Sequence, residues 1–372
     1  MRSDIEGICV LVLTTEAFGG HGGIAQYNRD LLNALCAIPE CAKVFALPRL
    51  MPHKPGPLPS KLVYLDDGLR GKWAYTLAAW RAARSRCDLV VCGHINLLPV
   101  AALASWRCSA PLVLLIYGID AWQPHRSKFV IRLLRRVAHV ISISEITRDK
   151  FSAWSGVPRE RIHVLPNAID LARYGTAPKN PMLEQRYGLA GKRVLMTLGR
   201  LSADERYKGF DEVLELLPEL LRSYPDLAYL IVGDGDDRDR LQRKAQSLGV
   251  ANRVVFAGYV AEPEKADHYR LADAYVMPGR GEGFGFVFLE AMACGVPVVA
   301  SRLDGSREAV RHGELGILVD PNNREELRAG IITALAQPRR IPPGIAYFAY
   351  PNFQQRLRAV MNDIVAKECM IQ

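Results

Sequence analysis

Two acidic side chains lie in a stretch that otherwise reads as buried core. The segment GRGEGFGFVFLEAMACGVPVVAS, residues 279–301, carries Glu282 in its glycine-rich opening and Glu290 in its apolar run. An unpaired buried carboxylate costs several kcal/mol, so Glu290 is expected to have hydrogen-bond donors around it. The hydroxyls of a ribose would supply such donors, and a structural ion pair with an arginine is the alternative.

The glycine-rich opening lies between a candidate strand, AYVMP, and a candidate helix, FVFLEAMACG. Gly281, Gly283 and Gly285 let backbone N–H groups approach a ligand closely. The N-terminus of the following helix favours an anionic phosphate. Glycine loops of this sort are common, so the pattern needs support from elsewhere in the chain.

A second cluster contains two basic residues. In LGRLSADERYKGFDEVL, Gly199 and Arg200 end a candidate strand, and Lys208 with Gly209 precedes a helix. Two cations that come from one strand, loop and helix unit, without carboxylate ligands, suit a diphosphate bound without metal. The alternative is a pair of solvated basic residues in a loop.

The third feature is TTEAFGGHGGIAQYNRDLL, which places four glycines between the first strand and the first helix. The pattern is not G-x-G-x-x-G, which argues against an ordinary dinucleotide site. Gly22 and Gly23 still form a loop that admits phosphate at a helix N-terminus. His21 is expected to be exposed.

These motifs lie between short β-branched runs and stretches of helical period. Helices are predicted at Ile24–Ala37, Trp73–Arg86 and Ser127–Val137. The predicted strands are ICVLVL, KVFAL, DLVVC, PLVLLIY, HVISIS and IHVLP in the first half, and RVLMTLG, LAYLIVG, RVVFAG, AYVMP, PVVAS and GILVD in the second. Strict alternation predicts two α/β doubly wound halves with parallel sheets, hinged near residues 168–185, where Pro, Gly and Asn are frequent and no period is visible.

Composition agrees with a globular protein of two domains. The chain has 372 residues, 49% of them hydrophobic and 23% charged, and single cores stop growing near about 250–300 residues. We read the first apolar run as a buried strand and not as a signal peptide, so we expect a cytoplasmic protein. The eight cysteines stand singly, which predicts free, mostly buried thiols and no structural zinc. The net charge of +9 suggests an anionic partner.

Taken together, three features resemble a retaining glycosyltransferase of family 4. They are Glu282 and Glu290 with seven residues between them, Arg200 with Lys208, and the Gly22-Gly23 loop. The resemblance covers nearly the whole chain, in the right order and spacing. It implies the GT-B fold, in which two Rossmann-like domains face each other across a cleft, here 1–170 for the acceptor and 171–345 for the nucleotide sugar. Residues 346–372 would form a helix returning to the first domain.

The resemblance also implies roles for the motif residues. Arg200 and Lys208 would neutralise the donor diphosphate, as a metal does elsewhere, so no cofactor or essential metal is expected. Glu290 would bind the ribose hydroxyls and Glu282 the donor sugar. The Gly283-Phe284-Gly285 backbone would hold the sugar and β-phosphate, Gly22 and Gly23 would approach the diphosphate, and Phe256–Val260, with Gly258 and Tyr259, would line the base.

Two sites raise further questions. Many family members carry a histidine after the strand that corresponds to PLVLLIY, where this chain has Tyr117, followed by Asp120. A tyrosine can donate a hydrogen bond to a sugar hydroxyl, and Asp120 could orient the acceptor, so both join Glu282, Arg200 and Lys208 as candidate catalytic residues. Asp234-x-Asp236 resembles a metal motif of another glycosyltransferase fold, but its place between a strand and a helix favours a capping role.

We therefore expect sugar transfer from a UDP- or GDP-sugar to a glycan or polyprenyl-diphosphate-linked acceptor, in cell-surface polysaccharide or glycolipid biosynthesis. Basic and aromatic residues crowd RGKWAYTLAAWRAARSR and HRSKFVIRLLRRVAH, which suggests peripheral binding to an anionic membrane at its cytoplasmic face; an ordinary solvated basic face is the alternative. No nucleic-acid-binding signature is present. The rival functions are a nucleotide-sugar epimerase of the same fold and an inactive nucleotide-sugar-binding protein.

Overall fold

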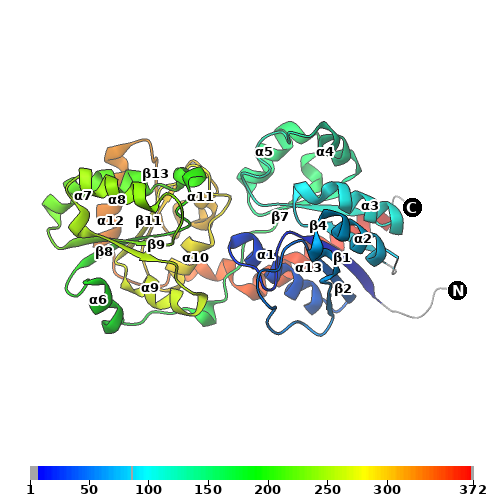
Figure 1. The fold of residues 1–372 in the computed structure, drawn as a ribbon, viewed down its shortest axis with the longest axis horizontal. Coiled ribbons are helices and arrows are strands. Elements are labelled where there is room, and N and C mark those ends of the chain that lie inside the picture. The colour runs from blue at the N-terminus through cyan, green and yellow to red at the C-terminus, as the bar shows by residue number, and fades with distance from the viewer. Residues whose placement is uncertain (1–6, 85–86, 370–372) are drawn as a thin grey trace. The chain divides into compact units, whose positions relative to one another are not determined.

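The chain folds into two compact units. The structure is a computed structural model that describes residues 7–84 and 87–369. Unit 1 comprises Met1–Ala168 and Tyr350–Gln372, and unit 2 comprises Ile169–Ala349 (Figure 1). The sequence boundaries were placed after residues 170 and 345, whereas the structure divides the chain after Ala168 and Ala349.

Unit 1 is built on a parallel sheet of seven strands in the order β3-β2-β1-β4-β5-β6-β7. The strands are β1 (Ile8–Thr14), β2 (Cys41–Pro48), β3 (Leu62–Tyr64), β4 (Leu89–Cys92), β5 (Leu112–Ile116), β6 (His139–Ser142) and β7 (Ile162–Val164). The helices are α1 (Gly23–Ala37), α2 (Lys72–Ala82), α3 (Leu98–Cys108), α4 (Lys128–Leu133), α5 (Glu145–Ser155) and α13 (Tyr350–Cys369).

Unit 2 is built on a second parallel sheet, of six strands in the order β10-β9-β8-β11-β12-β13. The strands are β8 (Arg193–Leu198), β9 (Leu227–Val232), β10 (Val254–Gly258), β11 (Ala274–Met277), β12 (Val298–Ser301) and β13 (Ile317–Val319). The helices are α6 (Pro181–Tyr187), α7 (Phe210–Ser223), α8 (Arg238–Ser247), α9 (Lys265–Leu271), α10 (Phe286–Ala293), α11 (Ser306–Ala309) and α12 (Arg324–Ala336). The predicted α/β class with two parallel sheets is confirmed.

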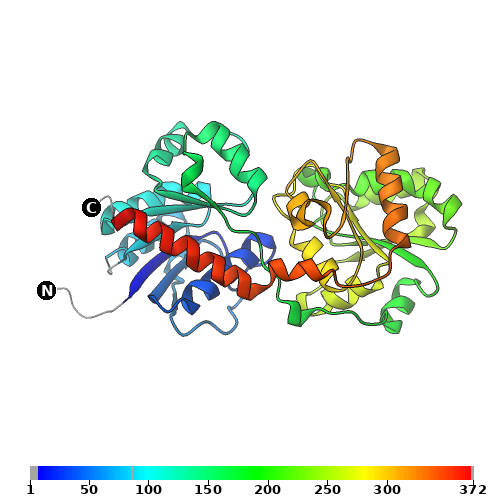
Figure 2. The same ribbon diagram turned by 180° about the vertical axis from the view of Figure 1, so that it is seen from behind.

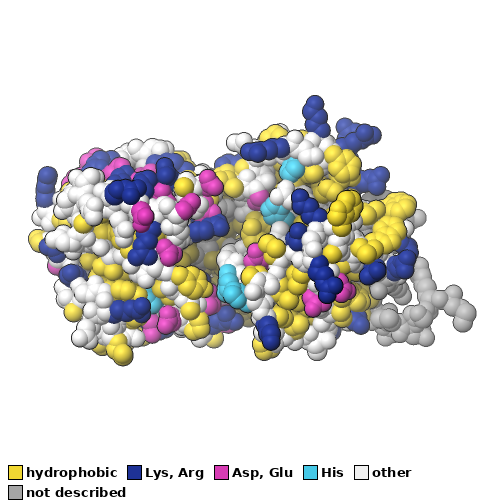
Figure 3. Space-filling view, in the orientation of Figure 1, with side chains coloured by type: hydrophobic (Ala, Val, Ile, Leu, Met, Phe, Trp, Pro, Cys, Tyr) yellow, Lys and Arg dark blue, Asp and Glu magenta, His cyan; other side chains and the backbone are white. Residues whose placement is uncertain are grey.

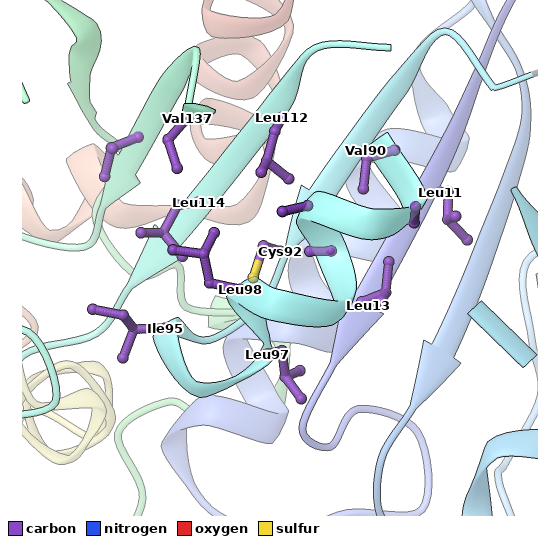
Figure 4. Packing of buried hydrophobic residues seen from close by; sticks show 14 of the residues in the cluster. Leu11, Leu13, Val90, Cys92, Ile95, Leu97, Leu98, Leu112, Leu114 and Val137 are labelled. Atoms are coloured by element: carbon purple, nitrogen blue, oxygen red, sulfur yellow. The ribbon is translucent and has the colours of Figure 1, made fainter. Parts of the chain in front are cut away.

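The core of unit 1 explains why its strands are continuous apolar runs. Leu11 and Leu13 of β1, Val90 of β4 and Leu114 of β5 all lie in one buried cluster (Figure 4), which also contains residues of α2, α3, α4 and α5. Strands buried on both faces of a parallel sheet have no polar face to alternate with. The apolar runs of the sequence therefore mark the strands of this core.

The C-terminal helix belongs to unit 1. Helix α13 runs beside α1, and the Tyr350 hydroxyl donates to the Asp30 carbonyl at 3.3 Å (Figure 2). Phe353 is fully buried and lies edge-on to Tyr27 of α1, with ring centroids 5.8 Å apart. The last segment of the chain is therefore part of the first fold.

Three sequence expectations about elements were wrong. The strand β3 was missed, because Leu62–Tyr64 is too short to show a period. The expected hinge contains helix α6, which begins after Asn180, whose side chain accepts from the Met182 N–H at 3.0 Å, and has proline at its start. Helix α2 ends at Ala82; residues 85 and 86 of the helix expected there lie outside the described residues.

Seven cysteine side chains are described, and all are free thiols: Cys9, Cys36, Cys41, Cys87, Cys92, Cys108 and Cys294. All of them except Cys108 are buried. Within residues 7–84 and 87–369, no helix has the length and apolar character needed to cross a bilayer.

Candidate functional site

The glycine loop between β11 and α10 is held in place by a buried aspartate. The Glu282 N–H donates to Asp304 Oδ2 at 2.9 Å, and the Gly305 N–H donates to the Glu282 carbonyl at 2.8 Å. The Ser306 hydroxyl donates to Asp304 Oδ1 at 2.6 Å. Burial raises the pKa of Asp304 to about 6, although these hydrogen bonds oppose the shift. Asp304 was not predicted from the sequence, although the Asp-Gly pair after β12 is a turn signal.

Two glycines of this loop are required by packing within the protein, whereas the sequence suggested close approach of backbone N–H groups to a ligand. Gly285 has a φ of +94° and precedes α10, so a side chain there would be strained and would meet Phe288. A Cβ on Gly281 would lie 2.8 Å from the Tyr207 ring. Phe284 is buried against Phe348, with ring centroids 5.5 Å apart. Close packing inside unit 2 is therefore enough to require glycine at Gly281 and Gly285.

The two cations of the second cluster meet at a carboxylate that the sequence analysis did not single out. Glu205 forms an ion pair with Arg200, and its Oε2 lies 3.5 Å from Lys208 Nζ. Lys208 Nζ also lies 3.8 Å from Glu282 Oε2. The Lys208 side chain is 16% exposed and that of Arg200 is 71% exposed, so the alternative of two solvated cations holds only for Arg200.

The structure therefore joins the second cluster to the glycine loop. Arg200 and Lys208 come from the β8–α7 connection, and Glu282 comes from the loop before α10. The only signal for Glu205 in the sequence is its position three residues before Lys208.

Glu290 is buried but not short of donors. Its Oε2 accepts from the Tyr269 hydroxyl at 2.7 Å, and its Oε1 accepts from the Tyr174 hydroxyl at 3.1 Å and from Lys265 Nζ at 3.5 Å. The alternative of an ion pair with arginine is wrong, because the cation is Lys265. The protein itself supplies three donors, while a carboxylate has about four acceptor positions, so the ribose contact of Glu290 stays a prediction.

A cavity of about 370 Å³ adjoins this network. It is lined by Arg173, Tyr174, Glu262, Pro263 and Ala266. Tyr174 joins it to Glu290, and Glu262 follows the segment Phe256–Val260 that we expected to line the base. In that segment Gly258 has a φ of +77° and Tyr259 is 69% exposed.

The acidic pair before α8 has a structural use other than capping. Asp236 Oδ1 accepts from the Ala203 N–H at 3.0 Å, and Asp234 pairs with Arg238 at 3.5 Å. The residue that precedes α8 is Asp237, and its side chain makes no capping hydrogen bond. The expected cap is therefore wrong in detail. The described residues contain no group of three or more His, Cys, Asp or Glu side chains placed to hold a metal ion.

In unit 1, Tyr117 stands where many family members carry a histidine, and its hydroxyl is hydrogen-bonded to another side chain. Tyr117 is 7% exposed, and its hydroxyl donates to Asn28 Oδ1 at 2.7 Å. Burial raises its pKa well above the ordinary value. A hydrogen bond from Tyr117 to a sugar would require this bond to break.

The glycine loop of unit 1 leaves open space before α1. Gly22 has a φ of +89° and is the residue preceding the helix, and a Cβ there would meet no atom within 4 Å. Gly23 is the first residue of α1. His21 is exposed, as expected, and its ring lies 4.7 Å from that of His53.

Helices α2, α3 and α4 carry large apolar side chains on the surface of unit 1. Trp73, Trp106 and Phe129 are 88%, 64% and 61% exposed. Figure 3 shows hydrophobic side chains gathered over α2 and α3, with Lys and Arg side chains around them. We name the surface around Trp73, Trp106 and Phe129 the aromatic face.

Two family models match successive parts of the chain. The model described as Glycosyltransferase Family 4 matches residues 21–173, and the one described as Glycosyl transferases group 1 matches residues 183–342. A solved structure of Anabaena Alr3699/HepE in complex with UDP and glucose superimposes with a TM-score of 0.70 and 25% identity, covering 97% of this chain and 99% of that one.

Curated relatives point to the same class. A GDP-mannose-dependent alpha-(1-6)-phosphatidylinositol monomannoside mannosyltransferase of Mycolicibacterium smegmatis is 38% identical over 240 residues, 60% of this chain and 62% of that protein. The mannosylfructose-phosphate synthase of Agrobacterium fabrum is 31% identical over 198 residues, 50% of this chain and 43% of that protein. The chain thus spans less than two thirds of either relative.

Proposed function

Because the chain belongs to glycosyltransferase family 4 and has the GT-B fold, we propose that it transfers a sugar from a UDP- or GDP-sugar to a glycan or lipid-linked acceptor, with retention of anomeric configuration. The observation that carries the proposal is the position of Lys208, 3.8 Å from Glu282 and in the same cluster as Arg200. Two cations beside a carboxylate on a glycine loop suit a diphosphate joined to a sugar.

The residues of unit 2 divide the work between them. Arg200 and Lys208 bind the diphosphate and stabilise the charge that develops as the nucleotide leaves, without a metal ion. Glu282 accepts from hydroxyls of the donor sugar, and the Gly283-Phe284-Gly285 backbone holds the sugar and the β-phosphate. The attacking acceptor hydroxyl loses its proton to the departing phosphate. The contact of Gly22 and Gly23 with the diphosphate stays a prediction.

The nucleoside lies beside Glu290 in this proposal. The fourth acceptor position of its carboxylate takes a ribose hydroxyl, and the three protein donors hold the carboxylate in place. The cavity beside Tyr174 takes the base, with Gly258 and Tyr259 at its edge. The relatives include proteins named for GDP-mannose and structures with UDP, so both bases are tested.

The first test is release of nucleoside diphosphate from a panel of UDP- and GDP-sugars, with and without EDTA. We expect one donor to be turned over in EDTA, and Lys208→Ala to lower the rate by about 100-fold or more, as the loss of a charge-stabilising group does. Lys244→Ala is the matched control, because it removes a lysine that pairs with Asp211 and Glu215 instead.

Three results would contradict the proposal. Equal loss in the two lysine variants would mean that Lys208 acts through stability. Turnover of a nucleotide sugar without release of nucleoside diphosphate would favour an epimerase. Tight donor binding with no turnover, even with a membrane lipid extract as acceptor source, would favour a binding protein.

The aromatic face supports a place for this reaction at the cytoplasmic surface of a membrane. Trp80 stacks on Trp106, with centroids 6.1 Å apart, and Arg107 lies 5.2 Å from the Trp80 ring. Exposed tryptophans insert at the boundary between headgroups and acyl chains, and each nearby Lys or Arg adds about 1 kcal/mol on an anionic surface. We propose peripheral binding of unit 1 to anionic lipid, where lipid-linked acceptors such as polyprenyl diphosphates reside.

Liposome flotation tests the membrane proposal. The protein should bind phosphatidylglycerol vesicles at low salt, and phosphatidylcholine vesicles much less. Trp73→Ser with Trp106→Ser should reduce binding, whereas Met182→Ser, which changes a side chain of unit 2 that is 79% exposed, should not. Binding that is absent at low salt, or equal in both variants, would refute the proposal.

A further inference from the structure

A polar cluster lies where β4 and β5 end in unit 1. Its members are His94 and Asn96, just after β4, and Asp120 and His125, in the segment after β5. Only Asp120 was anticipated from the sequence. His94 Nε2 lies 4.0 Å from Asp120 Oδ2, and His125 Nε2 lies 2.9 Å from Asn96 Oδ1. Ligands of doubly wound sheets bind beyond the carboxyl ends of the strands, which is the edge where this cluster lies.

Backbone amides fix which ring nitrogen of each histidine carries the proton. The Asn96 N–H donates to His94 Nδ1 at 3.1 Å, and the Ser127 N–H donates to His125 Nδ1 at 3.0 Å. Each Nδ1 is therefore an acceptor, and the neutral ring has its proton on Nε2. His125 thus donates to Asn96, and His94 directs its Nε2–H toward Asp120.

The charges in this cluster are small. Burial lowers the pKa of His94, and the neighbouring His125 lowers it further, so His94 is neutral near pH 7. Burial raises the pKa of Asp120 to about 7. A cluster without a fixed cation is poorly suited to a phosphate, and it suits an uncharged ligand that both donates and accepts hydrogen bonds.

The His94 Nε2–H donor faces the Asp120 Oδ2 acceptor, but the two atoms do not form a hydrogen bond. At 4.0 Å, His94 Nε2 and Asp120 Oδ2 are too far apart for a hydrogen bond. Asp120 Oδ2 is buried and has no hydrogen-bond partner among the residues that the structure describes. An unsatisfied buried acceptor destabilises the protein, so a group that joins the two side chains would be stabilised there.

The turn that carries His94 is anchored firmly in the core. Ile95, Leu97 and Leu98 follow it and belong to the same buried cluster as Leu114 and Leu13 (Figure 4). The Cys92 thiol adds a contact with the His94 carbonyl at 3.2 Å. The imidazole is therefore positioned by packing and not by a mobile loop.

We propose that His94 and Asp120 bind a hydroxyl group of a neutral sugar or polyol acceptor, which accepts from His94 Nε2 and donates to Asp120. Asn96 and His125 are positioning residues that hold the His94 ring. A hydroxyl oxygen about 2.8 Å from both atoms is compatible with their separation. The proposal rests on the transfer reaction proposed above, for which it names the acceptor chemistry.

Histidine NMR on the full chain tests the site without any catalysis. Methyl α-D-mannopyranoside or glycerol should shift the His94 ring nitrogen signals to saturation, and the shift should vanish in Asp120→Asn. Inorganic phosphate should have no such effect. The proposal is overturned if neither polyol shifts His94, or if phosphate shifts it more strongly than the polyols do.

Kinetics give the second test. His94→Asn keeps an oxygen that can accept from the Asn96 N–H but removes the Nε2 donor, whereas His94→Gln restores a donor near the Nε2 position. We expect His94→Asn and Asp120→Asn to raise the methyl α-D-mannopyranoside concentration that half-maximally stimulates nucleoside diphosphate release by about 5- to 100-fold. His94→Gln should recover part of this loss.

The control for these variants is His312→Asn in unit 2, where the residue has a φ of 56° that asparagine tolerates. If the acceptor dependence of nucleoside diphosphate release is unchanged in both His94→Asn and Asp120→Asn, the proposal is overturned and the transferase function still stands. Absence of nucleoside diphosphate release in the wild type would instead count against the transferase function, and the NMR experiment would still decide the site.

Discussion

Glu205 occupies the contacts that a donor diphosphate would need. It forms ion pairs with both Arg200 and Lys208, and the side chains of Glu205 and Lys208 are only 15% and 16% exposed. A diphosphate that binds these cations has to compete with this carboxylate. We therefore expect Glu205→Gln, which keeps the shape and removes the charge, to strengthen binding of UDP or GDP.

The size of the effect follows from the geometry. Two unit charges 3.5 Å apart, the separation of Glu205 from Lys208, attract by about 1 kcal/mol in water and about 5 kcal/mol at an effective dielectric constant of 20. Measured values for pairs near a surface are about 1 kcal/mol or less. A value of about 1 kcal/mol corresponds to roughly fivefold tighter binding.

Titration calorimetry with UDP and GDP measures this directly. Glu215→Gln is the matched control, because it removes the same charge from a carboxylate that pairs with Lys244 instead. We expect little change in the control and a smaller gain for Glu205→Gln at high salt. Weaker nucleotide binding by Glu205→Gln would refute the reasoning and would show that Glu205 orients the two cations for the ligand.

Three further predictions concern stability. Tyr269→Phe removes the 2.7 Å hydrogen bond to Glu290 and should lower the free energy of unfolding of unit 2 by about 1.5–3 kcal/mol, measured by urea denaturation; an unchanged midpoint would contradict the buried network. Burial lowers the pKa of His139 from 6.5 to about 4, so between pH 4 and pH 6.5 the unfolded chain binds more protons at this residue than the folded chain does. Unit 1 should keep this contribution to stability above pH 6.5 and lose it as the pH falls toward 4, and thermal melts of His139→Gln should show a weaker dependence. Gly233→Ala places a Cβ 1.9 Å from the Gly199 carbonyl oxygen at a φ of +131°, and should destabilise unit 2 by at least about 2 kcal/mol, visible in thermal melts monitored by circular dichroism.

The order of strands and helices could be predicted from the sequence because it depends on local patterns. Twelve strands were expected, and each corresponds to a strand of the two parallel sheets. The thirteenth, β3, has three residues and too few positions to show a pattern. Asn180 and a proline mark the start of helix α6. The helix was missed because we gave the Pro- and Gly-rich composition of the segment more weight than this capping signal.

The sequence by itself determined which motif residues to examine: Arg200, Lys208, Glu282 and Glu290 stand at spacings that local reading can recognise. Only the tertiary structure decided what those side chains contact. Glu290 accepts a hydrogen bond from Tyr174, which is 116 residues away, and His94 lies 4.0 Å from Asp120 because each follows one of two neighbouring strands. Such pairs depend on which strands are adjacent in a sheet and on how side chains pack between them, and neither leaves a periodic signal in the chain.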